Sequence, residues 1–299
     1  SFKLFLAAAV LVTEFFVVAL PLMITSAKAD GHPIQAITHA GFGGGTDVTT
    51  RMMLLRTRRY LKQDMQLVNK KGGGGAASMD YMMTLPADGQ HTLTWTTGHA
   101  VSMALGKTKV KLSDMQPLAR GTDDPQLFVV NCKNDIKDAK KFISAQKSKS
   151  LKYGTTHVGG IDDVSAIAFT KKGKLTDPTI VPYKGVGPIK TNLIKGDIDV
   201  GVLNLGEAVT EIEDGTLCVS VVLASNRMEK LSNVPTATEL GIPVVLSTVR
   251  GFVTRKGVPA DRKKQLEDAM IKAMEHKYFQ SFLTDIGLDS TSVVGADEW

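Results

Sequence analysis

Two glycine-rich runs occur where the sequence predicts the end of a strand and the start of a helix. Residues 41–46 read GFGGGT, and residues 154–160 read GTTHVGG. Without side chains the backbone can approach a ligand closely, and the unpaired amides of a first helical turn present donors and positive potential to an anion. Two such loops predict a cleft that binds an anion, although a tight turn that needs positive φ explains either run equally well.

The first of these loops is not a nucleotide-binding motif. It departs from G-x-G-x-x-G, and the sequence contains no G-x-x-x-x-G-K-[ST], which excludes a mononucleotide P-loop and disfavours a Rossmann site. Asp47 follows the loop, and a carboxylate there repels phosphate unless it caps the helix or meets a cationic group of the ligand. We predict capping as the default role of Asp47 and expect no cofactor.

Residue sets typical of catalysis or metal binding do not occur in the sequence. It has no G-x-S-x-G, no H-E-x-x-H and no cysteine with a suitable histidine context. His157 with Asp162 and Asp163 has the wrong spacing and too few partners for a metal site, and Asp163 is better explained as a helix cap. We therefore expect no catalytic residue and no metal.

The composition is that of an ordinary globular protein with a mild basic excess. Of its 299 residues 43% are apolar and 22% charged, and the formal net charge is +6. The basic residues form no dense run, and aromatic residues make up only 6%, so nucleic acid is not an expected partner. The net charge mildly favours anionic partners.

The amino terminus resembles an export signal. Residues 4–24 are almost continuously apolar, Lys3 precedes them, and an A-x-A box ends at Ala29. We expect cleavage after Ala29 and a periplasmic location. Glu14 and the length of the apolar stretch leave an uncleaved membrane anchor as the alternative.

Export would place the two cysteines in an oxidising compartment. If residues 126–132 and 217–224 pair antiparallel with Phe128 opposite Val222, then Cys132 lies opposite Cys218. This register permits a disulfide, and two buried thiols explain the pair equally well.

Short β-rich runs alternate with helical stretches, which is the pattern of an α/β fold. The pattern restarts after Pro125, and this predicts two lobes joined by two crossings. We expect a signal at residues 1–29, a first domain of residues 30–125 and 225–299, and a second domain of residues 126–224. Strands are predicted at residues 34–38, 65–69, 92–96, 126–130, 151–154, 179–182, 199–203 and 217–224, and a helix with one apolar stripe from Asp261.

The chain carries, in this order, the strings HAGFGGGTD, VNKKGGGGAASMDYMMTLPADGQHTL, YKGVGPIKTNLIKGDIDVGVLN and LSNVPTATELGIP. Together they resemble the successive signatures of the substrate-binding proteins of tripartite tricarboxylate transporters, the Bug family of solute receptors. The resemblance covers nearly all of the mature chain. It implies the periplasmic binding protein fold of the second structural type, with two mixed sheets joined by a double-strand hinge.

The resemblance also implies a ligand and a site. Family members bind small carboxylates between the lobes through backbone amides of the two opposed loops and ordered water. This chain is then expected to bind a mono-, di- or tricarboxylate and, as a monomer, to deliver it to the membrane subunits of a tripartite tricarboxylate transporter. The residues implied are Gly43, Gly44, Gly45, Thr46, Asp47, Thr96, Thr97, Gly98, Thr155, Thr156, His157, Gly159 and Gly160.

Two other functions fit the same scaffold. A secreted two-lobed enzyme could act on a small carboxylate, and a sensory module could present its closed form to a signalling partner. The lack of a nucleophile, base and acid set favours a receptor over an enzyme, whereas the sequence does not separate transport from signalling. The ligand-dependent rise in melting temperature without turnover would distinguish a receptor from an enzyme.

Overall fold

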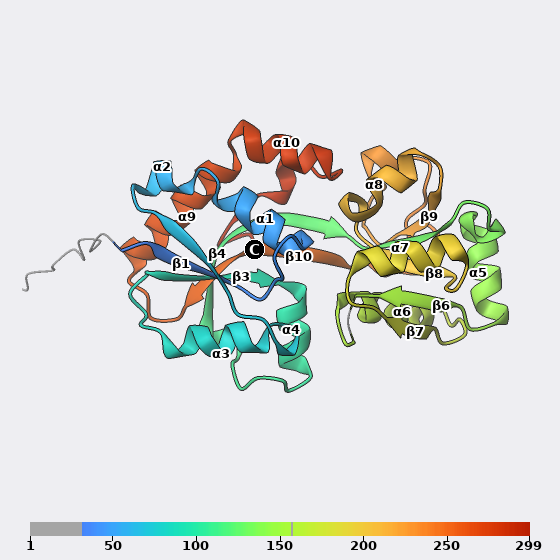
Figure 1. Cartoon of the computed structure of the whole chain (residues 1–299), viewed down its shortest axis with the longest axis horizontal. Helices are drawn as coiled ribbons and strands as arrows, with labels where there is room; N and C mark the ends of the chain where they lie inside the picture. Colours follow the sequence, from blue (N-terminus) through green and yellow to red (C-terminus); the bar gives the residue numbers. More distant parts are fainter. Residues whose placement is uncertain (1–31, 157) are drawn as a thin grey trace, which may run out of the picture. The chain divides into compact units, whose positions relative to one another are not determined.

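The computed structural model of the chain describes residues 32–156 and 158–299 and contains one mixed sheet of six strands and another of five (Figure 1). The predicted signal of residues 1–29 and the predicted site residue His157 lie outside the described residues. We call the part built on the six-stranded sheet the first lobe and the part built on the five-stranded sheet the second lobe. The fold is therefore α/β with two mixed sheets, as predicted.

The sheet of the first lobe combines parallel and antiparallel strands. Its order is β11-β4-β10-β3-β1-β2, with β1 parallel to β2 and β3, and β10 antiparallel to β3 and β4. Ile34, Ala36 and Ile37 are fully buried because helices cover β1 on both faces. The bounds are β1 Ile34–Thr38, β2 Met65–Asn69, β3 His91–Thr96, β4 Met115–Pro125, β10 Ser247–Arg255 and β11 Val294–Gly295.

Each face of this sheet has its own hydrophobic core. One core joins the sheet to α1, α2, α9 and α10, and the other joins it to α3. The predicted stripe of α9 is confirmed, since Leu266, Met270 and Met274 are fully buried. The helices of this lobe are α1 Gly45–Leu54, α2 Thr57–Leu61, α3 Ala76–Thr84, α4 Thr97–Ala104, α9 Ala260–Met274 and α10 Lys277–Asp285.

The second lobe repeats this layered arrangement with five strands in the order β7-β6-β8-β5-β9. Phe128, Phe142, Tyr153 and Phe169 are buried against one another on one face, with ring centroids 4.9–6.5 Å apart. Large aromatic side chains packed in this way stabilise the core of the lobe. The bounds are β5 Leu127–Asn131, β6 Lys152–Thr155, β7 Thr179–Pro182, β8 Val200–Leu203, β9 Leu217–Val222, α5 Ala139–Ser148, α6 Ile161–Lys172, α7 Val186–Lys195 and α8 Leu205–Glu213.

A disulfide joins Cys132 and Cys218, whose Cα atoms are 5.0 Å apart. The predicted register is wrong, because Val130 and not Cys132 lies opposite Cys218, and an irregularity follows Phe128. Side chains two residues apart on a strand point to the same face, so Cys132 still reaches its partner diagonally.

The chain crosses between the lobes twice, at adjacent positions. Gln126 N donates to Leu246 O at 3.0 Å, Leu223 N donates to Gln126 O at 2.9 Å, and Leu246 N donates to Leu223 O at 2.9 Å. The long strands β4 and β10 run side by side toward this point (Figure 1). The double-strand hinge expected from the resemblance therefore consists of residues around Gln126 and Leu246.

The segment of residues 225–246 packs on the second lobe, whereas the sequence assigned it to the first. Ala237, Ile242 and Val244 belong to one core of the second lobe, and Met228 and Leu231 belong to the other. The segment lacks the periodicity of a helix or strand, so its pattern did not reveal which core would bury it. We therefore propose a domain boundary between Leu246 and Ser247 in place of residue 225.

Within the described ranges, none of the helices combines the length and the apolar character that a membrane crossing requires.

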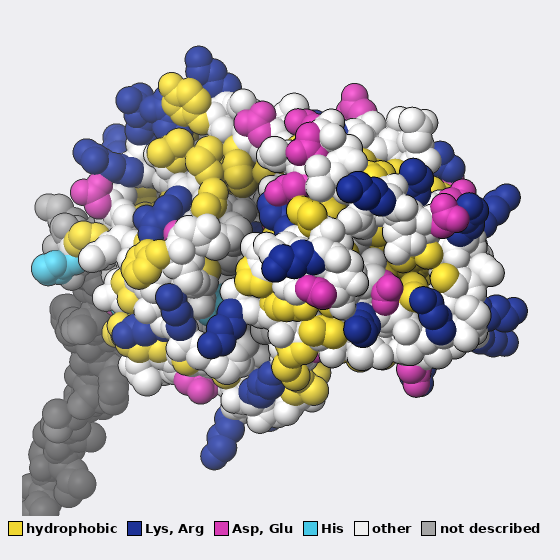
Figure 2. All heavy atoms as spheres, turned by 45° about the vertical axis from the view of Figure 1, so that its right-hand side comes forward, with side chains coloured by type: hydrophobic (Ala, Val, Ile, Leu, Met, Phe, Trp, Pro, Cys, Tyr) yellow, Lys and Arg dark blue, Asp and Glu magenta, His cyan; other side chains and the backbone are white. Residues whose placement is uncertain are grey.

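Lys and Arg side chains are spread over both lobes on the face seen in Figure 2, with Asp and Glu side chains between them.

Candidate functional site

A cavity of about 580 Å³ lies between the lobes, where three helices of the described chain begin. The first turns of α1, α7 and α8 border it, together with side chains of β4 and β10. Unpaired amides and the helix dipoles give such a place a positive potential. The lining residues are Gly43, Gly44, Gly45, Val48, Thr49, Asp124, Thr156, Gly185, Val186, Gly187, Lys190, Gly206, Glu207, Arg250, Phe282 and Ile286.

The first glycine loop is shaped by Asp47, which lies in the first turn of α1 behind the cavity. Gly43 N donates to Asp47 Oδ2 at 3.1 Å, and Arg51 Nε donates to the same oxygen at 2.9 Å. Burial opposes ionisation of this carboxyl, but the hydrogen bonds from Arg51 and Gly43 outweigh it and hold its pKa below the ordinary value. Asp47 thus orders the loop, and the N-cap position itself belongs to Gly44.

Two helices of the second lobe begin at the opposite wall. Gly185 has φ 110° and forms the N-cap of α7, a backbone conformation that favours glycine. Asn204 caps α8, and Glu207 completes a capping box because its Oε2 accepts a hydrogen bond from Asn204 N at 3.0 Å. Asn204 Nδ2 also donates to Asp124 O at 2.9 Å, which ties α8 to β4.

A buried ion pair between the two hinge strands faces the cavity. Arg250 Nη1 donates to Asp124 Oδ2 at 3.2 Å, and the two side chains are 5% and 4% exposed. Arg250 Nε also donates to Thr46 Oγ1 at 3.4 Å. Burial raises the pKa of Asp124 to about 7, Arg250 opposes this rise, and the negative charge of Glu207 adds to it.

Glu207 and Lys190 carry further charge at the cavity wall. Burial raises the pKa of Glu207, which its hydrogen bond from Asn204 and the charges of Arg250 and Lys190 only partly offset. Lys190 Nζ pairs with Glu211 Oε1 at 2.7 Å, so Lys190 brings little unbalanced positive charge. The formal charges of the lining side chains balance, because Asp124 and Glu207 are matched by Lys190 and Arg250, and the helix dipoles add positive potential.

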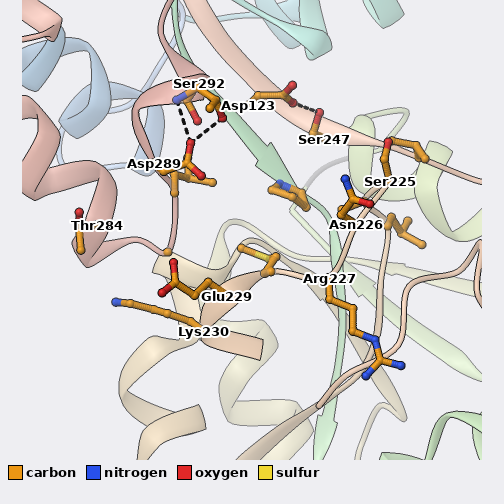
Figure 3. Close-up of a pocket in the computed structure, with 18 of the residues that line it drawn as sticks. Asp123, Ser225, Asn226, Arg227, Glu229, Lys230, Ser247, Thr284, Asp289 and Ser292 are labelled. Carbon is orange, nitrogen blue, oxygen red and sulfur yellow. Dashed lines mark hydrogen bonds between the residues drawn. The ribbon is translucent and has the colours of Figure 1, made fainter. Parts of the chain in front are cut away.

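Asp123, the neighbour of Asp124, faces a different cavity of about 630 Å³ (Figure 3). Consecutive side chains of a strand point to opposite faces, which separates the two carboxylates. Ser247 donates to Asp123 Oδ1, and Arg120 donates to Asp123 and to the carbonyl of Ser292. Because these charged groups are paired within the protein, we place the candidate site in the cavity at Asp124.

Four of the predicted site residues lie together in the wall of this cavity: Gly43, Gly44 and Gly45 from the first loop, and Thr156 from the second. Thr46 is not part of the wall, but its Oγ1 accepts a hydrogen bond from Arg250, which is. Asp47 lies behind the loop and accepts from Gly43 N. His157 is outside the described residues. The structure does not bring Thr96, Thr97, Gly98, Thr155, Gly159 or Gly160 into the wall.

Backbone amides of the second glycine loop donate to side chains in the first turn of α6, the helix that follows the loop. Thr156 N and Oγ1 donate to Asp162 Oδ2 at 2.8 and 2.6 Å, and Gly159 N donates to Asp163 Oδ2 at 2.6 Å. Asp163 therefore accepts from the loop within the first turn of α6, and its predicted role as the helix cap is wrong because the N-cap position belongs to Gly160. Within residues 32–156 and 158–299, no group of three or more His, Cys, Asp and Glu side chains is placed to hold a metal ion.

The residues at the end of β3 form hydrogen bonds at the start of α4 and to the hinge strand β10, and they do not line the cavity. Thr96 and His99 form a capping box at the start of α4, and His99 is fully buried and stacks on Trp95 with ring centroids 5.1 Å apart. Burial and the nearby His39 hold the pKa of His99 well below its usual range. Thr97 Oγ1 donates to Ser247 O at 3.0 Å and accepts from Val249 N.

Sequence reasoning missed Gly185, Lys190, Glu207, Asp124 and Arg250 as site residues. The glycine pair at residues 185 and 187 follows the predicted strand at residues 179–182, and this signal could have identified the start of α7. Asp124 and Arg250 carry no comparable local signal, because their pairing joins positions 126 residues apart.

Two α/β lobes, a double-strand hinge and a cavity lined by helix N-termini define a two-lobed solute-binding protein. The sequence matches the family described as "Tripartite tricarboxylate transporter family receptor" over residues 49–297, and the chain belongs to this family. This match confirms the resemblance seen in the sequence motifs. The family is one of solute-binding receptors rather than enzymes.

Known relatives and solved structures agree with this assignment. BugT of Bordetella pertussis is 27% identical over 220 residues, which are 71% of this chain and 66% of BugT. A TctC solute-binding protein from Polaromonas shares the fold with a TM-score of 0.78 and 24% identity, covering 91% of this chain and 93% of that one. MatC from Rhodopseudomonas palustris, solved with bound malate, has a TM-score of 0.71 and 26% identity, covering 86% and 90%.

Proposed function

We propose that the chain is a periplasmic receptor that captures a small carboxylate between its lobes and delivers it to the membrane subunits of a tripartite tricarboxylate transporter. The observation that supports this most is the meeting of the first turns of α1, α7 and α8 at one cavity, in a chain of the receptor family. Donors fixed in three helices are preorganised for a carboxylate, so little ordering cost accompanies binding.

The residues proposed to contact the ligand come from both lobes. Gly45 would present its amide from the first loop, whose Gly43 and Gly44 amides already donate to Asp47 Oδ2 and Gly41 O. The glycines at the start of α7 and α8 would present amides from the other side. Arg250 adds a charged donor that is held in place by Asp124. Closure would be a hinge motion at Gln126 and Leu246, and the closed form would be the one that the transporter recognises.

Calorimetry and thermal melting with a panel of carboxylates test this proposal. We expect at least one acid to bind with 1:1 stoichiometry and to raise the melting temperature, with the acid recovered unchanged. Conversion of the acid would support the enzyme alternative. No binding to any acid of the panel would contradict a carboxylate receptor.

A further inference from the structure

One carboxylate of the cavity wall, Glu207, has an oxygen that faces the space proposed for the ligand. Its Oε2 accepts from Asn204 N at 3.0 Å, and in the described part of the chain no donor reaches its Oε1. A side chain added at Gly45 would meet Glu207 Oε1 at 3.6 Å, so this oxygen borders the space in front of Gly45. The cap of α8 therefore uses one oxygen of Glu207 and leaves the other open to a ligand.

The donors proposed for a ligand carboxylate lie at the same place. A side chain added at Gly45 would also meet Arg250 Nη2 at 3.7 Å. Among the described residues Nη2 has no acceptor, because the hydrogen bonds of Arg250 use its Nη1 and Nε. Gly45 in the first turn of α1 and Gly206 in the first turn of α8 both line the cavity, so two helix starts add amides. A carboxylate held by these donors lies against Glu207 Oε1.

Two carboxylates at hydrogen-bond distance do not both stay ionised. Their like charges repel, one pKa of the pair rises, and the pair keeps one proton. The lining side chains leave no cation to spare for a ligand, because Asp124 and Glu207 already match Lys190 and Arg250. A ligand carboxylate beside Gly45 therefore favours the protonated form of Glu207, whose O–H can donate to it.

The surroundings of Glu207 act on its ionisation in both directions. Charged groups of four elements face it: Asp162 of α6, Asp124 of β4, Arg250 of β10 and Lys190 of α7. Burial raises the pKa of Glu207 and Asp162 adds to the rise, whereas the hydrogen bond from Asn204 and the two cations oppose it. A ligand carboxylate would raise the pKa further.

Asp124 is the other carboxylate of the wall, but a ligand does not reach its free oxygen. Its Oδ2 accepts from Arg250 Nη1 at 3.2 Å, and its Oδ1 is buried away from the cavity. Burial raises the pKa of Asp124 to about 7, so this group titrates near neutral pH on its own. Direct hydrogen bonding to a ligand carboxylate is therefore left to Glu207.

We propose that Glu207 binds the ligand through a shared proton: the ionised acid takes up one proton from the solvent as it binds, and Glu207 Oε1–H donates to the carboxylate that accepts from Arg250 Nη2. No bond of the ligand breaks, and the proton returns to the solvent when the acid is released. Capture of the acid is thus weaker at high pH. This inference rests on the proposed function and names a further ligand contact of that site.

Calorimetry on the full chain at pH 8 measures how many protons accompany binding. The probes are succinate, malate, adipate, 4-methylpentanoate and 3-phenylpropanoate, each titrated in HEPES and in Tris, whose ionisation enthalpies differ. The free acids are ionised at this pH, so a buffer-dependent enthalpy reports proton uptake by the complex. We expect about one proton for each bound acid. Binding without proton uptake overturns the inference while the receptor function stands, whereas no binding by any acid contradicts the receptor function itself.

The variant Glu207→Gln replaces the protonated carboxyl by an amide that donates at every pH. Its oxygen can still accept from Asn204 N, so the cap of α8 is kept. Between pH 7 and pH 9 the wild type should lose about tenfold or more in affinity, since uptake of one proton changes the affinity by up to about tenfold per pH unit. Glu207→Gln should lose less than about threefold, take up no proton and bind at least as tightly as wild type at pH 9. A variant that keeps the pH slope, or that binds no acid at either pH, overturns the assignment.

Two further variants separate Glu207 from its neighbours. Asp123→Asn is the matched control, since Asp123 faces the other cavity (Figure 3), and it should keep the pH slope and the proton uptake of the wild type. Asp124→Asn removes the partner of Arg250 and should weaken binding, yet uptake at pH 8 should persist. Uptake that disappears in either variant and persists in Glu207→Gln would overturn the inference.

Discussion

The two glycine loops look alike in sequence but differ in what their backbones do. In both, a carboxylate in the first turn of the following helix accepts from the loop: Asp47 from Gly43, and Asp163 from Gly159. The first loop nevertheless borders the cavity with three glycines, whereas among the described residues of the second loop only Thr156 does so. A glycine run before a helix thus indicates an ordered turn, and its role in binding depends on which way the turn faces.

In the second lobe the place opposite the first loop is taken by α7 and α8. Gly187 lies in the first turn of α7 with open space around the position of a Cβ, and Gly206 lies in the first turn of α8. We therefore propose Gly187 as the counterpart of Gly45 in the second lobe, about 30 residues beyond the loop that the sequence suggested. The comparison can be tested by placing side chains into each of these turns.

The largest effect is expected where a side chain fills the cavity. Gly45→Leu and Gly187→Leu require no positive φ and should each abolish ligand binding in calorimetry, because the added side chain occupies the space of the ligand. Val158→Ser, in the exposed part of the second loop, should leave affinity unchanged. If Val158→Ser weakened binding as much as Gly187→Leu did, the second loop and not α7 would be the counterpart of the first loop.

A smaller effect is expected from the carboxylates that order the loops. Asp47→Ala and Asp163→Ala should each cost about 0.5–2 kcal/mol in the free energy of unfolding, as for the loss of a side-chain acceptor at a helix start. Only Asp47→Ala should also weaken ligand binding, by roughly tenfold (about 1.4 kcal/mol), because Asp47 holds the backbone of the loop whose three glycines line the cavity. Urea unfolding and calorimetry on both variants measure the two quantities. Equal losses of affinity would remove the distinction between the loops.

The smallest effect is the pH dependence of the first loop. The folded-state pKa of Asp47 is below its unfolded value, so its ionised form stabilises the fold above about pH 4, and this stabilisation is lost as the pH falls through the folded pKa. The difference in unfolding free energy between wild type and Asp47→Asn should be constant from pH 8 to pH 5 and should shrink toward pH 3. If the difference in unfolding free energy were unchanged at pH 3, the stabilisation by Asp47 would not depend on its charge.

Much of the fold was predictable because it follows from local patterns. The strands at residues 34–38, 65–69 and 179–182 occur at the predicted bounds, since apolar runs between turn residues define them. The first loop and the start of α1 were predictable for the same reason. The helices α4, α5 and α10 were not named, and β4 was missed because its charged and proline residues interrupt the apolar pattern of a strand.

The candidate site was predictable only in part. Gly43, Gly44, Gly45 and Thr156 are marked by their glycine-rich context and by the family motifs. Glu207 looks from the sequence like an ordinary helix-start residue, and its capping bond to Asn204 explains it fully without a ligand. Only the tertiary structure places its second oxygen, Oε1, at the cavity beside Gly45 of the first lobe.

The sequence by itself determined the α/β class, the family, the position of the first loop and the two cysteines that could pair, because each depends on residue types at short spacing or on ordered motifs. The tertiary structure alone decided that the disulfide pairs diagonally, that residues 225–246 join the second lobe, and that Asp124 and Arg250 meet at the cavity. These features depend on which surfaces pack against each other across long stretches of chain, and no local pattern encodes that choice.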